Sequence, residues 1–397
     1  MNKYIHFFFT VVFSMTMIAL ISLSECKEKD NLPNFIIIMA DDLGYGDIGC
    51  YGNNRIMTPN IDRLAAEGLK FTDYHANGPV CTPTRAALLT GRYQQRSGME
   101  GVIYVGGETR QYGIDKKEIT FAEVLKTKGY ATGVIGKWHL GYKKVFNPIH
   151  QGFDVFKGYV SGNIDYISHY DNAGIYDWWH NLDSTSEEGY VTDLITLHSC
   201  EFIEQYADQP FCLYVAHEAP HWPYQGRSDK ADRYPGVNFE SQGSRPDKLG
   251  AYKEMVEIMD ESVGKIVNKL VELDLEENTL VIFCSDNGAV QIGDNGGLRG
   301  YKTTLWEGGH RVPAIAWWPG KINPGITNDL TCSMDIFPTM VNLTGIEGKI
   351  LPEFDGINIT PILFDDKSFN NRKIFWRYRN FKCARQGDWK IILADST

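Results

Sequence analysis

The chain has 397 residues, a hydrophobic content of 43%, which is enough for a large core, and a formal net charge of −11. A negative charge of this size, without a basic run, excludes a nucleic-acid-binding surface, so local positive charge would have to hold any anionic substrate. The eight cysteines are widely spaced and form no C-x-x-C pair. They indicate neither a zinc site nor a dense disulfide framework, although export would permit one or two bridges.

Residues 1–26 have the pattern of an export signal. Lys3 precedes an apolar run with small residues near its end, which suits an export signal better than a membrane span. Cys26 closes the outline of a bacterial lipoprotein box, although Glu25 stands where a small residue is normal. We therefore expect an exported protein that is periplasmic, secreted, or attached to a bacterial membrane through a lipid on Cys26.

The remaining length suits one large α/β domain, residues 31–368, and a small C-terminal α+β subdomain, residues 369–397. Strand-like runs alternate with helical patterns, which predicts a large mixed, mostly parallel sheet flanked by helices. The expected helices run from Thr58-Pro59 to near Gly68, from the capping box Thr120–Glu123 to Gly129, and from about Ala251 to Leu273, whose methionines are expected in the core.

Four apolar runs lack alternation and end abruptly in polar residues. Such runs are typical of strands buried on both faces. In open parallel sheets, ligands bind outside the carboxyl ends of the strands, so these endings predict one shared site. The runs are Phe35–Ala40 before Asp41 and Asp42, Ala131–Ile135 before Lys137 and His139, Phe211–Val215 before His221, and Val281–Cys284 before Asp286 and Asn287.

Two of these strand endings supply three carboxylates and one amide between them. Asp41, Asp42, Asp286 and Asn287 make an all-oxygen set, which a hard divalent cation prefers. Ca²⁺ tolerates irregular coordination whereas Mg²⁺ requires octahedral order, so the set favours Ca²⁺ over Mg²⁺. Each pair could instead cap a helix or form a turn.

Cys81 precedes Pro83 and a run of helix formers that ends at Gly91, which predicts a cysteine at a helix N-terminus with proline at the first helical position. That end of a helix favours an anion, and Arg85, one turn along, adds a fixed cation. A buried structural thiol is the alternative interpretation.

Lys137, Lys302 and two histidines complete the candidate site. The lysines can neutralise an anionic ester in a water-poor cleft. A leaving alkoxide needs a proton, and His139 or His221 titrates near neutral pH, although either histidine alone could be structural. Between about Tyr159 and Tyr190 the chain is rich in Gly, Asn, Asp and aromatic residues, which is compatible with a sugar-binding platform or with a packed surface insertion.

Several segments resemble the motifs of the sulfatase family, in the family's order. The pentapeptide Cys81–Arg85, continued to Arg92, resembles the sulfatase signature. Within the family, the chain is most similar in character to arylsulfatase A and N-acetylgalactosamine-6-sulfatase members. This resemblance implies an alkaline phosphatase-like fold. The other matching segments are Ile37–Asp47, Gly133–Gly141, Ala219–Pro223, Ser285–Gly288, and Gly296–Lys302 followed by Glu307–Pro313.

The resemblance also implies a role for each candidate. A separate formylglycine-generating enzyme would oxidise Cys81 to the formylglycine nucleophile, which Arg85 stabilises. Asp41, Asp42, Asp286, Asn287 and the modified Cys81 would bind Ca²⁺, Lys137 and Lys302 would hold the sulfate, and His221 and His139 would act as acid and base, in an order that spacing does not settle.

The implied activity is hydrolysis of a sulfate ester, with a sulfated carbohydrate as the expected substrate. The alternatives are a phosphomonoester or phosphonate ester hydrolase of the same superfamily and a noncatalytic glycan-binding relative. The family usually continues beyond Gly387–Ile392, so the C-terminal subdomain looks abbreviated or truncated. No substrate contact from that region is therefore carried over.

Overall fold

The computed structural model describes residues 32–394, apart from 238, 366 and 370. The export signal predicted for residues 1–26, with Cys26, lies outside the described residues. Within the described residues, no helix is both long enough and apolar enough to cross a membrane.

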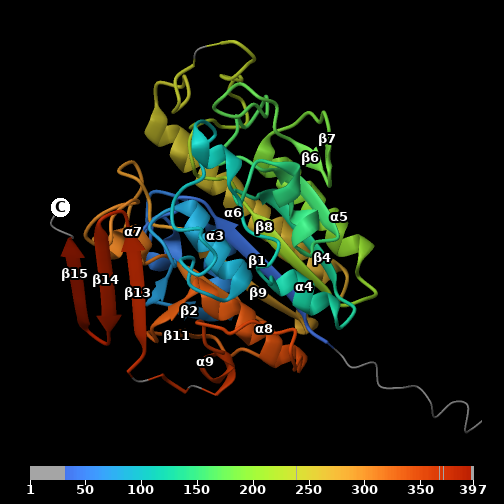
Figure 1. Cartoon of the computed structure of the whole chain (residues 1–397), viewed down its shortest axis with the longest axis vertical. Helices are drawn as coiled ribbons and strands as arrows, with labels where there is room; N and C mark the ends of the chain where they lie inside the picture. The colour runs from blue at the N-terminus through green and yellow to red at the C-terminus, as the bar shows by residue number, and fades with distance from the viewer. Residues whose placement is uncertain (1–31, 238, 366, 370, 395–397) are drawn as a thin grey trace, which may run out of the picture. The chain divides into compact units, whose positions relative to one another are not determined.

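A ten-stranded sheet forms the middle of the structure, in the order β11-β2-β10-β9-β1-β8-β4-β5-β6-β7 (Figure 1). The neighbours β9, β1, β8, β4 and β5 are parallel, whereas β10 is antiparallel to both β9 and β2. The predicted mixed, mostly parallel sheet is therefore confirmed. The strands are β1 (Asn34–Ala40), β2 (Leu69–Phe71), β4 (Ala131–Lys137), β5 (Val155–Tyr159), β6 (Trp179–His180), β7 (Asp183–Ser184), β8 (Phe211–Ala216), β9 (Thr279–Ser285), β10 (Ala314–Trp317) and β11 (Gly325–Thr327).

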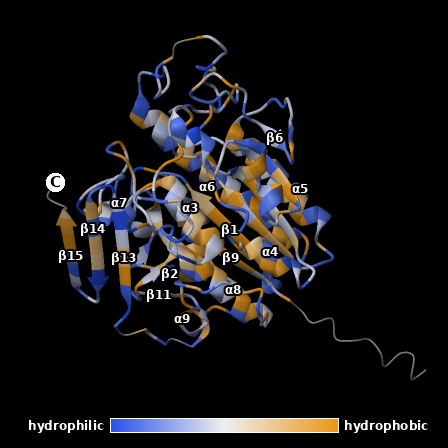
Figure 2. Cartoon of the chain, in the orientation of Figure 1, coloured by the Kyte–Doolittle hydropathy of each residue, from blue (hydrophilic) through white to orange (hydrophobic). Residues whose placement is uncertain are grey.

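The four predicted apolar strands are the central strands β1, β4, β8 and β9. All of their residues are buried, which requires cover on both faces of the sheet. Hydrophobic residues accordingly concentrate in the middle of the sheet (Figure 2). The neighbouring strand ends are in register, because Ala40 pairs with Ser285 and Met39 pairs with Ala216.

Two groups of helices pack around the sheet. Helix α6 contacts both α2 and α5, and α3, α4 and α8 form a second group. Met255 and Met259 of α6 are buried in the core, as predicted. The helices are α2 (Pro59–Glu67), α3 (Cys81–Thr90), α4 (Phe121–Lys126), α5 (Val191–Gln205), α6 (Lys248–Glu272), α7 (Glu307–His310), α8 (Ile336–Thr344) and α9 (Thr360–Phe364).

Two helix boundaries differ from the prediction. The capping box of Thr120 and Glu123 forms, but α4 ends at Lys126, and a turn leads on to Gly129. Helix α3 begins at Cys81, so Pro83 is its third residue and not its first. A proline is tolerated there because the first N–H groups of a helix have no intrahelical acceptor.

The C-terminal part is a three-stranded antiparallel sheet of β13 (Lys373–Tyr378), β14 (Phe381–Gln386) and β15 (Trp389–Ala394). Trp376 lies in a buried cluster with Cys332 and Met334, and its indole N–H donates to Ala76 O at 2.9 Å. The described residues beyond Ser368 form strands and turns alone. A further pair of short parallel strands, β3 (Tyr74–His75) and β12 (Thr331–Cys332), contributes Cys332 to this cluster.

The aromatic segment between Tyr159 and Tyr190 is largely packed inward. Tyr166 and Trp178 are buried members of the main core cluster. The Tyr166 hydroxyl donates to the backbone carbonyl of His221 at 3.0 Å. These rings therefore behave as a packed insertion. All seven described cysteines are free, and Cys26 lies outside the described residues.

Gly136 is expected to be indispensable for strand β4. Its φ is +106°, and a Cβ there would lie 2.1 Å from the carbonyl oxygen of Ala216 on β8. We expect Gly136→Ala to lower the free energy of unfolding by at least about 3 kcal/mol, because backbone strain and overpacking add. Urea denaturation measures the loss.

Gly98→Ala is the matched control, because Gly98 also has a positive φ, of +72°, but nothing lies within 4 Å of its added Cβ. It should cost only about 1 kcal/mol of backbone strain. Equal losses in the two variants would show that the contact with β8 is unimportant.

Candidate active site

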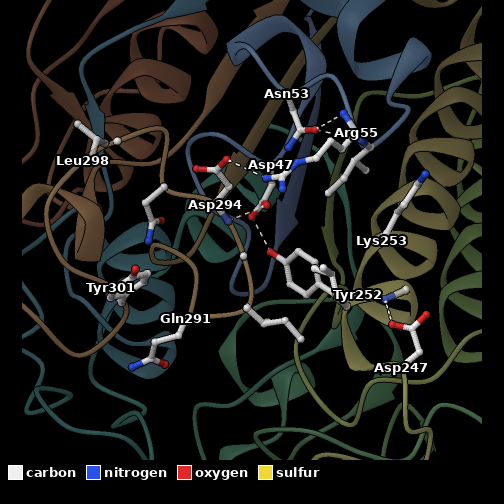
Figure 3. A pocket seen from close by; sticks show the side chains of 17 residues that line it. Asp47, Asn53, Arg55, Asp247, Tyr252, Lys253, Gln291, Asp294, Leu298 and Tyr301 are labelled. Carbon is white, nitrogen blue, oxygen red and sulfur yellow. Dashed lines mark hydrogen bonds and ion pairs between the residues drawn. The ribbon is translucent and has the colours of Figure 1, made fainter.

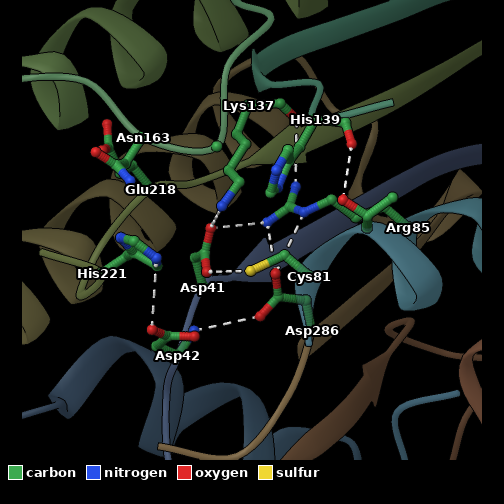
Figure 4. A network of polar contacts seen from close by, with 12 residues as sticks. Asp41, Asp42, Cys81, Arg85, Lys137, His139, Asn163, Glu218, His221 and Asp286 are labelled. Atoms are coloured by element: carbon green, nitrogen blue, oxygen red, sulfur yellow. Dashed lines mark hydrogen bonds and ion pairs between the residues drawn. The ribbon is translucent and has the colours of Figure 1, made fainter. Parts of the chain in front are cut away.

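Polar residues follow four neighbouring strands at one edge of the sheet. Asp41 and Asp286 come directly after the paired ends of β1 and β9, and Lys137 is the last residue of β4. His221 lies in the segment that follows β8. Figure 4 shows these side chains converging on Cys81 at the start of α3. The structure thus brings the strand endings and the cysteine together, as the sequence predicts.

Cys81 lies at the centre of this cluster with only 2% of its surface exposed. Its Sγ is 3.5 Å from Asp41 Oδ1 and 3.4 Å from Lys302 Nζ. Burial and the neighbouring Asp41 carboxylate raise the pKa of the Cys81 thiol well above its ordinary value. The unmodified side chain therefore stays protonated, which makes it a weak nucleophile.

Arg85 joins α3 to the sheet. The guanidinium is completely buried and donates to Asp286 Oδ2 at 2.9 Å and to Asp41 Oδ2 at 3.2 Å. Its remaining nitrogen donates to Lys137 O at 3.2 Å and to the Tyr214 hydroxyl at 3.1 Å. A buried charge needs such full pairing, so Arg85 is bound firmly in place.

The predicted metal ligands have oxygens to spare. Asp42 Oδ2 and Asn287 Oδ1 are buried and have no hydrogen-bond partner among the described residues. Ligand atoms of Asp41, Asp42, Cys81 and His221 lie within 4.8 Å of one another. An unpartnered carboxylate oxygen beside an unpartnered amide oxygen is costly unless a cation binds there. The oxygens of Asp41, Asp42 and Asn287 therefore fit a hard divalent cation such as Ca²⁺. Asp286 is not part of this close group, and its Oδ2 accepts from Arg85.

The charges of the cluster nearly balance without a metal ion. Burial alone would raise the pKa of Asp41, but Lys137, His221 and Arg85 together hold that pKa far below its ordinary value. Burial and the charge of Asp41 raise the pKa of Asp286 to about 6. Lys302 Nζ pairs with Asp42 Oδ1 at 2.6 Å. A divalent cation added to three carboxylates and three cations would leave excess positive charge for an anionic ester.

Burial keeps the two histidines of the cluster neutral. Burial lowers the pKa of His221 to about 4 and that of His139 well below its ordinary value. His221 Nδ1 donates to Trp222 O at 2.7 Å, and its Nε2 lies 3.7 Å from Asp42 Oδ2. His139 Nε2 donates to Ile103 O at 2.9 Å, so its buried Nδ1 is the unprotonated nitrogen.

A cavity of about 350 Å³ opens over the cluster. Cys81, His139, His221 and Lys302 line it, whereas Arg85 and Lys137 lie behind its wall. Trp222 belongs to the motif segment Ala219–Pro223, and Asn163 and Asn172 belong to the aromatic segment. The sequence did not single out four other lining residues, which belong to no motif: Tyr104, Tyr142, Tyr378 and Arg379.

A larger cavity of about 790 Å³ holds no comparable set of reactive groups (Figure 3). Its buried carboxylate, Asp47, accepts hydrogen bonds from the Tyr252 hydroxyl at 2.5 Å and from the Gly44 amide at 2.7 Å. Arg55 pairs with Asp294 at 3.5 Å on its rim. These contacts hold in place the segment that follows Asp41 and Asp42, so the polar groups of the larger cavity have a structural role. We therefore assign the chemistry to the smaller cavity.

The fold and the cluster place the chain among ester hydrolases with an alkaline phosphatase-like α/β sheet. Residues 33–346 match the sulfatase family model. The chain is 36% identical to human arylsulfatase A over 373 residues, covering 87% of this chain and 70% of that protein. It is 35% identical to N-acetylgalactosamine-6-sulfatase of Sus scrofa, covering 90% and 71% of the two chains. The chain therefore belongs to the sulfatase family and is a sulfuric ester hydrolase.

Solved structures share the same architecture. The crystal structure of Ps i-CgsB superposes with a TM-score of 0.82 at 30% identity, covering 92% of this chain and 84% of that chain. The phosphonate monoester hydrolase of Agrobacterium radiobacter has a TM-score of 0.62 at 19% identity, covering 91% and 89%, which shows a shared fold alone.

The neutral state of His221 predicts a pH-dependent stability. The folded protein holds the pKa of His221 at about 4, against an ordinary value of 6.5. As the pH falls below 6.5, the unfolded chain takes up the proton first, so stability is lost until the pH reaches about 4. His221→Gln should remove up to about 3 kcal/mol of this loss.

The measurement is urea denaturation at pH 7 and pH 4.5 without added calcium. His150→Gln replaces an exposed histidine and should keep the wild-type pH dependence. If His221→Gln also kept the wild-type pH dependence, a group other than His221 would cause the loss of stability at low pH.

Proposed function

We propose that the protein removes sulfate from an O-sulfated carbohydrate, with formylglycine made from Cys81 as nucleophile. We further propose that Asp41, Asp42, Asp286 and Asn287 hold Ca²⁺. One observation carries the proposal: a buried Cys81 lies between Asp41 and Lys302, next to the unpartnered oxygens of Asp42 and Asn287.

Conversion of Cys81 to formylglycine removes a chemical problem that the thiol would have as a nucleophile. A thiol attacking a sulfate ester would form an intermediate that is hard to release. The hydrated aldehyde carries two hydroxyls on one carbon. One oxygen attacks sulfur and the sugar oxygen leaves, and loss of the proton from the other hydroxyl then breaks the C–O bond. Sulfate departs and the aldehyde is restored, with no water attack on sulfur.

The positively charged side chains can stabilise the negative charge that develops on the sulfate during the reaction. Lys302 reaches the cavity and lies beside Cys81, and Lys137 reaches the same cluster through its contact with Asp41. A bound Ca²⁺ would supply further Lewis-acid stabilisation of the sulfate oxygens. Arg85 lies behind Cys81, so we assign it to holding the nucleophile and the carboxylates.

His221 and His139 are assigned to proton transfer. His221 is proposed to protonate the leaving sugar oxygen, and His139 to take the proton that triggers sulfate release. Both are neutral in the free protein. An anionic substrate would favour their protonated forms, and so would help His221 to donate.

A carbohydrate suits the walls of the cavity. Tyr104, Tyr142 and Trp222 line it with aromatic side chains, and Asn163 and Asn172 line it with amides. Ps i-CgsB has been crystallised in complex with k-i-k-neocarrahexaose. Export through residues 1–26, a lipid on Cys26 and maturation by a formylglycine-generating enzyme belong to the same proposal.

A phosphomonoester or phosphonate ester hydrolase is the second candidate. Phosphoryl transfer uses a similar set of metal and cations, and the fold is shared with a phosphonate monoester hydrolase. Rates on an aryl sulfate and the matching aryl phosphate, measured on the same matured sample, separate the two candidates. A higher kcat/KM for the phosphate would overturn the sulfatase assignment.

Cys81→Ala should lower turnover of an aryl sulfate by at least about a thousandfold, because the nucleophile is removed. In protein made with the maturation enzyme, mass spectrometry should find a loss of about 18 Da at Cys81. Cys212→Ala removes another buried thiol, on β8, and should retain turnover. Wild-type rates in Cys81→Ala would contradict the covalent step.

Calcium should stabilise the protein and support turnover. At a calcium concentration about 100 times Kd, the free energy of unfolding should rise by about 2.7 kcal/mol. A strong chelator should abolish both effects, and added Ca²⁺ should restore them.

Asp42→Asn should weaken this response, whereas Asp294→Asn, in the larger cavity, should leave it intact. Thermal denaturation with and without Ca²⁺ tests both variants. The assignment fails if chelator-treated wild type keeps full activity.

A further inference from the structure

The turn between β13 and β14 reaches the cavity over Cys81. Tyr378 ends β13 and pairs with Phe381 on β14, which leaves a two-residue turn that begins at Arg379. Tyr378 and Arg379 line the cavity together with Cys81 and Lys302. The C-terminal sheet, from which no substrate contact was predicted, therefore forms part of the cavity wall.

The lining of this cavity has one sign of charge. No Asp or Glu is among the residues that line it, although the whole chain carries a net charge of −11. Lys302 and Arg379 are the lysine and arginine of the lining. Lys302 is already bound to Asp42 and Cys81. The guanidinium of Arg379 is therefore a second positive group, separate from the reacting centre.

Arg379 differs from the other arginines near this sheet. Arg372 pairs with Asp335, Arg377 with Glu100 and Arg385 with Asp73. Among the described residues, no carboxylate forms an ion pair with Arg379. Its guanidinium stands 5.2 Å from the ring centre of its neighbour Tyr378. A cation without an acidic partner at a cavity rim is available to an anionic ligand.

The turn itself gives no reason for an arginine. Arg379 has a φ of +51°, in the left-handed region that favours glycine or asparagine. Holding a longer side chain there strains the backbone. An unfavourable backbone conformation at a cavity rim points to a role for the side chain.

The sheet holds the turn in a fixed place. Arg385 of β14 donates to Asp73 at 2.7 Å, and Lys390 of β15 donates to Glu307 at 2.7 Å. Glu307 opens α7, five residues after Lys302. The first pair ties the sheet to the segment before β3, and the second ties it to the start of α7, which follows Lys302. Figure 1 shows α7 next to this sheet, so the turn with Arg379 does not belong to a loose hairpin.

We propose that Arg379 binds a second anionic group of the substrate, so that the preferred ligand is a sulfated oligosaccharide with another sulfate or a carboxylate on the neighbouring sugar. This inference rests on the proposed function, because it takes the first sulfate to lie at Cys81. The shared chemistry is an oxyanion that accepts paired N–H groups from a guanidinium.

Binding titration tests the proposal without turnover. The full chain with unconverted Cys81 and added Ca²⁺ is titrated with three disaccharides that carry the same sulfate on the first sugar. The second sugar is a neutral hexose, a hexose sulfate or a hexuronic acid. Wild type should bind at least one dianionic disaccharide about 10-fold to 100-fold more tightly than the neutral one, the range for a charged hydrogen-bond pair.

Arg379→Gly should reduce this ratio to within about threefold of unity. Glycine suits the positive φ, so the variant should unfold at or above the wild-type temperature, which separates lost binding from lost folding. Arg379→Lys should recover part of the ratio. Lys373→Gln removes an exposed charge from the other end of β13 and should change nothing.

The three disaccharides also identify the second anion. If only the hexose sulfate or only the hexuronic acid raises the binding affinity, that group is the one that Arg379 binds. Equal affinities of wild type for the three disaccharides would overturn the proposal, as would a wild-type ratio in Arg379→Gly. Failure of the proposed function is a different result: matured protein would then release no sulfate from any of the three disaccharides or from an aryl sulfate.

Discussion

The site depends on one buried ion pair network, in which the Arg85 guanidinium holds the Asp41 and Asp286 carboxylates together. Burial raises the pKa of Asp286, and the repulsion of the neighbouring Asp41 carboxylate raises it further. Arg85 offsets this repulsion from within α3. The same interaction fixes the start of that helix, and therefore Cys81, against the ends of β1 and β9.

This arrangement lowers the stability of the free protein, but it provides the preorganised charges that an ester hydrolase needs. Buried charges and the unpartnered oxygens of Asp42 and Asn287 lower stability unless a cation satisfies them. The large core of buried strands can bear that cost. In return, the charges are already in place when an anionic ester arrives, so little reorganisation is needed during the reaction.

The sequence predicts well which residues meet at the strand ends, and predicts poorly which residues form the cavity wall. Asp41 and Asp286 were predictable because an apolar run shows where a buried strand ends, and parallel strands end at one edge. Cys81 and Arg85 were predictable from their spacing on one helix. Tyr104 and Arg379 have no such signal, since only tertiary packing brings a distant loop and a hairpin turn over Cys81. Composition also could not tell that Tyr166 points into the core.

The two parts of the site therefore answer to different constraints. Residues at the strand ends are set by sheet register, so Asp41 or Lys137 can hardly move without disturbing the core. The wall residue Arg379 occupies a two-residue turn whose flanking strands are held by Trp376 and Arg385. A change in the turn alters the charge over the cavity and leaves those anchors intact. Under the proposed assignments, substrate preference varies at the turn, while the chemistry at Cys81 stays with the sheet.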